Sequence, residues 1–148
     1  KPFFLIHEGE NDYLLAHEAS SALGLKIPII KETDPIKIKG ILGTCTGTIG
    51  SRYHGLVSAL SQGVPSLATG WSHKYRELFD DYGFPEGMID ITSPDLEIKE
   101  KIDTILDYEK SKNIQNTIIK HSVRLKKQTE KMWNKVFAMI EKNLGSEV

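Results

Sequence analysis

The segment TCTGTIGSRYHGLVSALSQGVPSLA, residues 44–68, contains the strongest fold signal in the chain. Its small residues at 44–49 predict a buried strand, and Gly50-Ser51 predicts a tight turn. Apolar residues at helical spacing predict a helix over 52–62, and 64–68 predicts a second strand. A strand, a helix and another strand in this order are typical of a parallel sheet covered by helices.

The flanking sequence continues the same alternation. Further strands are expected at 3–7, 27–30 and 88–91, and further helices at 12–23, 35–42, 74–82, 95–108 and 113–144. Asp34 is the expected cap of the helix at 35–42, and Gly83 is the expected stop after 74–82. We therefore expect an α/β protein with a Rossmann-like, three-layer α/β/α fold and a mostly parallel sheet.

The composition is that of an ordinary globular domain. The chain has 148 residues, of which 39% are hydrophobic and 26% are charged, and its net charge is −1. It contains no long apolar run and no leader pattern, and it begins at Lys1, which suggests an excerpt of a longer protein. Its single cysteine, Cys45, is expected to be a small buried thiol rather than a nucleophile, in a reducing cytoplasm.

The charge is distributed unevenly. Residues 1–109 carry 10 Lys/Arg against 17 Asp/Glu, whereas residues 110–148 carry 9 against 3. The basic end is either a solvated helix face or a contact for an anionic membrane surface, an acidic partner or the rest of the protein. One apolar stripe along 113–144 is expected to be buried, and so long a helix exceeds the width of a small domain. The expected division is a lobe at 1–110 and a long helix at 111–148 that reaches toward another lobe.

Cationic residues follow both central strands. Parallel strands present ligands outside their carboxyl ends, where Gly50-Ser51 is expected to lie. Ser51 is the expected helix cap, and the free amides behind it attract an anion. Arg52 adds a bidentate donor, and His54 reaches the same ligand only if Arg52 lies in the cap and His54 in the first turn. Lys74 follows the next strand and is expected to face them, which predicts an anion site.

Weaker candidates and simpler interpretations remain beside this site. His73 belongs to the second turn, and Trp71 is expected either to stack on a sugar or base or to pack internally. Alternatively, both residues have only structural roles: Arg52 pairs with a carboxylate, and His54 caps a helix. The glycines of 43–50 match no dinucleotide or P-loop pattern, the five histidines show no metal-ligand spacing, and no nucleic-acid partner is expected.

The motif residues resemble the polysaccharide pyruvyl transferase family. Arg52, His54, Gly63 and Pro65 match its signature, and Lys74 takes the basic position after the next strand. The resemblance covers about 27–92 well. It implies the C-terminal lobe of a GT-B-like protein with two Rossmann-like lobes, which transfers pyruvate from phosphoenolpyruvate onto two hydroxyls of a sugar, as a ketal and without a further cofactor.

The anion site agrees with that chemistry. Arg52, Lys74 and the amides at Gly50-Ser51 would hold the phosphate and the carboxylate, and His54 is the candidate general acid. The missing N-terminal lobe is expected to supply part of the site, including the side for the saccharide acceptor, so this chain alone is expected to be inactive. The expected location is cytoplasmic, with peripheral contact to the inner membrane face through the basic helix.

Two other functions stay open. One is the C-terminal lobe of a nucleotide-sugar-dependent glycosyltransferase, with Arg52 and Lys74 on the diphosphate and Glu32 as the only acidic candidate for the ribose. The other is a non-catalytic lobe that binds phosphate or sugar.

Overall fold

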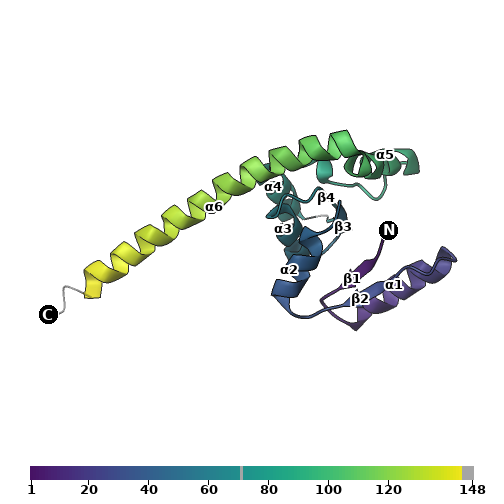
Figure 1. The fold of residues 1–148 in the computed structure, drawn as a ribbon, viewed down its shortest axis with the longest axis horizontal. Helices are drawn as coiled ribbons and strands as arrows, with labels where there is room; N and C mark the ends of the chain where they lie inside the picture. The colour runs from purple at the N-terminus through teal and green to yellow at the C-terminus, as the bar shows by residue number, and fades with distance from the viewer. Residues whose placement is uncertain (71, 145–148) are drawn as a thin grey trace. The chain divides into compact units, whose positions relative to one another are not determined.

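The chain forms two compact units. The computed structural model describes residues 1–70 and 72–144, and it divides the chain into Lys1–Thr44 and Cys45–Val148 (Figure 1). Trp71 therefore lies outside the described residues. Each unit contains its own pair of strands and its own helices, and each is described by itself below.

The first unit has the order strand, helix, strand, helix. Its elements are β1 (Phe4–Ile6), α1 (Glu10–Ala22), β2 (Ile29–Lys31) and α2 (Pro35–Gly43). The strands β1 and β2 are parallel, with Phe4 opposite Ile29. The Asp34 carboxylate accepts the backbone N–H groups of Ile36 and Lys37, at 2.8 and 3.3 Å, which confirms Asp34 as the cap of α2.

The second unit repeats this order and adds two helices. Its elements are β3 (Thr48–Gly50), α3 (Tyr53–Leu60), β4 (Ser66–Ala68), α4 (His73–Asp81), the 3₁₀ turn η1 (Pro85–Gly87), α5 (Asp95–Leu106) and α6 (Tyr108–Leu144). The strands β3 and β4 are parallel, with Gly50 opposite Ala68. The core lies between these strands and the helices, and its most buried large side chains are Leu60, Leu67, Phe79, Ile105 and Ile118.

The α/β class and the parallel pairing are confirmed. The four named strands of the described residues form two separate pairs, β1–β2 and β3–β4. A single three-layer sheet of the Rossmann or GT-B type stays a prediction. The named strands are also shorter than expected, because only three residues of each strand pair with the neighbouring strand.

The expected strand at 88–91 is wrong. Met88 makes a single parallel bridge with Ala68, and the Ile89 amide donates to the Ala68 carbonyl at 2.8 Å. The chain then turns at once, because the Asp90 carboxylate accepts both the amide and the hydroxyl of Thr92, at 2.8 and 2.7 Å. These local bonds compete with the sheet and limit the third strand position to one residue.

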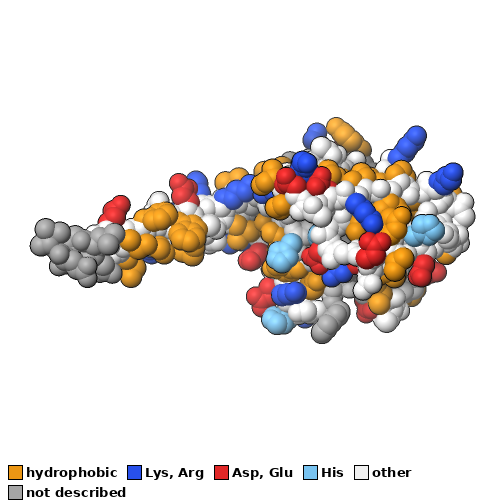
Figure 2. Space-filling model, turned by 90° about the horizontal axis from the view of Figure 1, so that it is seen from below, with side chains coloured by type: hydrophobic (Ala, Val, Ile, Leu, Met, Phe, Trp, Pro, Cys, Tyr) orange, Lys and Arg blue, Asp and Glu red, His pale blue; other side chains and the backbone are white. Residues whose placement is uncertain are grey.

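The last helix packs along only part of its length. Helix α6 has 37 residues, or about 56 Å at about 1.5 Å per residue. Ile118 is fully buried, but Met132, Trp133, Phe137 and Ile140 are 49–55% exposed. Figure 1 shows α6 extending past the other helices of its unit, and Figure 2 shows hydrophobic side chains along this extension. The expectation of one buried stripe along 113–144 is therefore wrong for its second half, and the side chain of Leu144 lies outside the described residues.

The first half of α6 holds the C-terminal ends of two helices. The Ser122 hydroxyl and the Lys126 ammonium group donate to the Ser61 carbonyl after α3, at 3.0 and 3.1 Å. The Arg124 guanidinium donates to the Asp81 carbonyl of α4 at 3.0 Å, and His121 Nδ1 lies 3.0 Å from the same oxygen. Cations stabilise the negative end of a helix dipole, so part of the basic charge of α6 serves the fold itself.

None of the described helices is both long enough and apolar enough to span a lipid bilayer.

Candidate functional site

Two helices of the second unit begin at the same edge of its strand pair. The strands β3 and β4 end side by side at Gly50 and Ala68, and the Thr69 amide donates to the Gly50 carbonyl at 3.2 Å. Helix α3 starts after the first strand and α4 after the second. In parallel sheets this carboxyl edge is where ligands bind, because loops and helix N-termini converge there.

Arg52 and His54 lie at the start of α3. Arg52 is the N-cap residue, with extended backbone angles, and His54 is the second residue of the helix. Ser51 precedes the cap, so the expected role of Ser51 as the cap is wrong. The condition that allows both side chains to reach one ligand, Arg52 in the cap and His54 in the first turn, is met. In the described residues no side chain caps the first turn of α3 or of α4.

Lys74 lies close to the α3 turn. It is the second residue of α4, as His54 is of α3. Its ammonium nitrogen is 5.0 Å from the ring centroid of Tyr53 and 5.4 Å from that of Tyr75, within cation–π range. Tyr53 is the residue between Arg52 and His54, so this contact brings the second cationic turn beside the first.

The two tyrosines connect the turns further. The rings of Tyr53 and Tyr75 meet edge to face, with centroids 5.6 Å apart. The Tyr75 hydroxyl donates to the Ser51 carbonyl at 2.6 Å, across 24 residues of sequence. Neither tyrosine is predicted as a site residue from the sequence. The available signal was a tyrosine directly after the basic residue of each turn, in Arg52-Tyr53 and in Lys74-Tyr75.

The candidate side chains lie on an open surface. Ser51, Arg52, His54, His73 and Lys74 are all exposed, and Gly50, the last residue of β3, is half-buried. Water screens charges in such a place, so each contact to an anion there is worth less than it would be in a closed pocket. These exposed residues at the carboxyl ends of β3 and β4, called the cationic edge or cationic cradle below, form an open surface rather than a closed pocket. In residues 1–70 and 72–144, no three His, Cys, Asp or Glu side chains are grouped to hold a metal ion.

Burial makes the charged forms of two ionisable groups of this unit less favourable. Burial raises the pKa of the Tyr82 phenol, and the nearby Asp81 and Tyr53 raise it further. Burial also raises the pKa of the Cys45 thiol. A nucleophilic cysteine needs its thiolate, so the raised pKa does not favour a nucleophilic role. Cys45 is half-buried, however, so the expectation of a buried thiol is met only in part.

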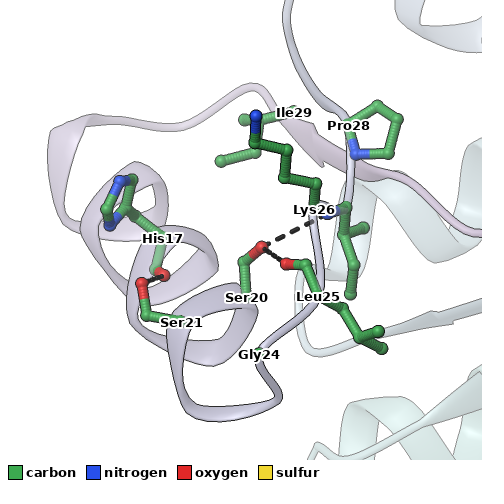
Figure 3. Close-up of a pocket in the computed structure, with 9 residues that line it drawn as sticks. His17, Ser20, Ser21, Gly24, Leu25, Lys26, Pro28 and Ile29 are labelled. Carbon is green, nitrogen blue, oxygen red and sulfur yellow. Dashed lines mark hydrogen bonds between the residues drawn. The ribbon is translucent and has the colours of Figure 1, made fainter.

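A separate hollow lies in the first unit. It has a volume of about 540 Å³ and is lined by His17, Ser20, Ser21, Gly24, Leu25, Lys26, Ile27, Pro28 and Ile29 (Figure 3). Its serines brace the loop between α1 and β2. The Ser20 hydroxyl donates to the Leu25 carbonyl and accepts the Ile27 amide, and the Ser21 hydroxyl donates to the His17 carbonyl at 2.9 Å. The hollow lies where β2 begins, away from the carboxyl ends of the strands.

Fold and site together define an α/β protein with a cationic cradle at the carboxyl ends of parallel strands. The family model for polysaccharide pyruvyl transferase matches residues 1–73. The amylovoran biosynthesis protein AmsJ of Erwinia amylovora is 28% identical to this chain over 119 residues, which cover 79% of the chain and 27% of AmsJ. No solved structure matches the chain.

The first 73 residues of the chain match the polysaccharide pyruvyl transferase family. The resemblance carried by the motif residues is thereby confirmed. The matched segment includes Arg52, His54, Gly63 and Pro65 and ends at His73, one residue before Lys74. The chain spans about a quarter of the length of the curated relative it matches.

Proposed function

We propose that this chain is one lobe of an enzyme that transfers pyruvate from phosphoenolpyruvate to a sugar of a cell-surface polysaccharide, as a ketal. The observation that carries the proposal is the family match over 1–73, which includes both Arg52 and His54. The geometry of the second unit supports it, because these residues start α3 beside Lys74 of α4.

The proposed roles follow from the chemistry of each side chain. Phosphoenolpyruvate carries a phosphate and a carboxylate on neighbouring positions. The Arg52 guanidinium offers paired donors suited to either group, and Lys74 offers a mobile point charge. The uncapped amides of the first turns of α3 and α4 add donors at the positive ends of two helix dipoles. Ser51, His73 and Trp71 complete the proposed substrate-binding residues.

The proposed reaction needs an acid and an anion-stabilising group. His54 donates a proton to the methylene carbon, which becomes the methyl group, and one sugar hydroxyl adds to the central carbon. A second hydroxyl of the sugar then displaces phosphate from that carbon and closes the ketal. Of the two hydroxyl protons, one replaces the proton supplied by His54 and the other leaves with phosphate. Arg52 and Lys74 stabilise the departing phosphate.

The nucleotide-sugar alternative is disfavoured by the placement of Glu32. Its carboxylate accepts the backbone amides of Thr33 and Asp34, at 2.9 and 3.0 Å. These bonds lower the pKa of Glu32 and commit the side chain to the turn before α2. The best acidic candidate for a ribose contact is thus engaged in local structure.

The proposal includes a second lobe of the same polypeptide. That lobe would supply the side of the site that binds the saccharide acceptor. The chain covers only 27% of AmsJ, which supports the presence of further lobes. The exposed apolar half of α6 would pack on that lobe, and the chain alone would bind the donor weakly and catalyse nothing. A cytoplasmic location, with peripheral membrane contact through basic α6, belongs to the same proposal.

A binding experiment tests the anion site. Phosphoenolpyruvate, inorganic phosphate and a nucleotide-sugar are titrated separately into this chain, and backbone amide shifts are followed by NMR, which detects weak binding. We expect phosphoenolpyruvate to shift the amides of residues 50–55 and 72–75. Arg52→Ala should weaken binding about 10-fold, the low end of the range for a charge-assisted contact of about 1.5–3 kcal/mol, because water screens this exposed site.

The matched control is Lys127→Ala. Lys127 is exposed on α6, and its loss changes the net charge by the same amount as Arg52→Ala. The control should bind phosphoenolpyruvate as the unaltered chain does. Equal affinity in Arg52→Ala and Lys127→Ala would overturn the assignment of Arg52, and preferred binding of the nucleotide-sugar would favour the glycosyltransferase.

Activity tests the role of His54. In the full-length protein that contains this chain, His54→Ala should slow pyruvyl transfer about 100- to 10,000-fold, the usual contribution of a general acid, with little change in donor affinity. His17→Ala is the histidine control, since His17 lies in the first unit beside the loop hollow. A transfer rate in His54→Ala close to that of the control would refute the acid role.

A further inference from the structure

Tyr75 has no role in the proposed binding of phosphoenolpyruvate, although it lies between the two cationic turns. It is the third residue of α4, directly after Lys74, yet its side chain is only 9% exposed and points into the unit. Its hydroxyl donates to the Ser51 carbonyl at 2.6 Å. That carbonyl belongs to the residue directly before Arg52, at the entry to α3. A single side chain thus connects the start of α4 with the turn that carries Arg52 and His54.

The ring of Tyr75 is held on two further sides. It meets the Tyr53 ring edge to face, with an interplanar angle of 82°. On another side it lies against Gly70, where an added Cβ atom would come within 2.5 Å of three ring carbons. The tight fit explains the glycine in the loop after β4, because a larger residue would displace the ring. The Tyr75 ring is therefore fixed before any ligand arrives.

We infer that Tyr75 is a positioning residue that sets the spacing between the two cationic turns. Through the bond to Ser51 and the contact with Tyr53, it fixes Arg52 and the first turn of α3 relative to Lys74. An anion held by both turns then meets donors already in place. This inference rests on the proposed anion site and names the residue that organises it; Tyr75 itself need not touch the ligand.

The test compares two hydroxyl deletions at opposite ends of α3. Tyr75→Phe removes the bond to the Ser51 carbonyl before α3, and Ser122→Ala removes the bond to the Ser61 carbonyl after α3. Both side chains are buried, Tyr75 at 9% and Ser122 at 4% exposure. Each variant should lower the thermal unfolding temperature to a similar extent. Only Tyr75→Phe should weaken binding of phosphoenolpyruvate, or of inorganic phosphate used as the second probe, by about 3- to 10-fold.

A double-variant cycle separates positioning from general loosening. If Tyr75 acts through the α3 turn, adding Tyr75→Phe to Arg52→Ala should cost much less affinity than Tyr75→Phe costs alone. In the free protein, Tyr75→Phe should also shift the amide signals of Tyr53 and His54, whereas Ser122→Ala should not. Additive losses, or equal affinity in Tyr75→Phe and Ser122→Ala, would overturn the inference.

The outcomes distinguish this inference from the proposed function. If the unaltered chain binds inorganic phosphate but not phosphoenolpyruvate, the donor assignment fails, and the comparison of Tyr75→Phe with Ser122→Ala is decided with phosphate. If phosphoenolpyruvate binds and Tyr75→Phe retains full affinity, the proposed function stands and the positioning role fails. If the unaltered chain binds neither probe, the anion site and the role of Tyr75 both fail.

Discussion

At the scale of single residues, the family signature combines two different kinds of position. Arg52 and His54 are exposed at the start of α3. Pro65 belongs to the buried core, and Gly63 has a φ of +84°, in the left-handed region. The exposed positions are available to a ligand, whereas the buried ones shape the chain between β3 and β4. The signature therefore contains a site and the turn that supports it.

Gly63, in the turn between α3 and β4, should tolerate substitution less well than Gly50 in the same unit. An added Cβ atom would lie 2.5 Å from Cγ1 of Ile119 on α6, and the positive φ disfavours any L side chain. We expect Gly63→Ala to lower the free energy of unfolding by about 1–3 kcal/mol, measured by urea denaturation. Gly50→Ala is the control in the same unit, because its Cβ atom meets nothing within 4 Å. It should change stability by less than about 0.5 kcal/mol, and equal stability of the two variants would contradict this account.

At the scale of helices and strands, local signals determined what the sequence could predict. All six helices of the described residues were expected near their observed positions, because caps and stops such as Asp34 and Gly83 act within a few residues. The sequence predicts the start of α6 near Asn113, whereas the helix begins at Tyr108. Asp107 was the missed signal, since its carboxylate accepts the Lys110 amide at 2.9 Å.

Strands and side-chain contacts were harder to predict. Strand pairing depends on partners distant in sequence, so the observed pairs are shorter than the apolar runs suggest. The two cationic turns follow from the order of strands and helices alone. The bond from Tyr75 to Ser51 does not, because it depends on how α4 is oriented across 24 residues. The spacing of apolar residues shows that a helix has an apolar face, but not which part of the protein covers that face. The exposure of the second half of α6 therefore does not follow from the sequence.

The turn that replaces the fifth strand should depend on pH. Hydrogen bonds from Thr92 lower the pKa of Asp90 below its usual value. Because the folded pKa is lower than the unfolded one, of about 3.9, this contribution to stability is complete above the unfolded pKa and is lost as the pH falls through the folded one. Between pH 6 and pH 2.5, Asp90→Asn should therefore lose less stability than the unaltered chain in urea titrations. Identical pH dependence in the two proteins would contradict the assignment.

At the scale of the whole molecule, some of the large apolar side chains are buried in the cores and others are exposed to solvent. Two compact units bury their own cores, while α6 carries large apolar side chains past the packed part of the second unit. Stability within this unit should therefore depend on the first half of α6 far more than on the second.

Two substitutions on the same helix test this division. Ile118→Ala should cost about 2–5 kcal/mol of unfolding free energy, because Ile118 is fully buried in the core. Phe137→Ala should cost less than about 0.5 kcal/mol, because Phe137 is 55% exposed. Hydrogen exchange should likewise be slower over 108–126 than over 127–142. Comparable losses from the two variants, measured by urea denaturation, would show that the second half of α6 is packed in this chain.

The open placement of the cationic edge has an evolutionary consequence. Arg52, His54 and Lys74 contribute little to the core, while the strands beneath them end in buried Ala68 and half-buried Gly50. New side chains at these exposed positions would leave the fold almost as stable as before. Proteins descended from one ancestral lobe could therefore change their specificity from one anionic donor substrate to another through a few surface substitutions. They would not first need compensating substitutions in the core.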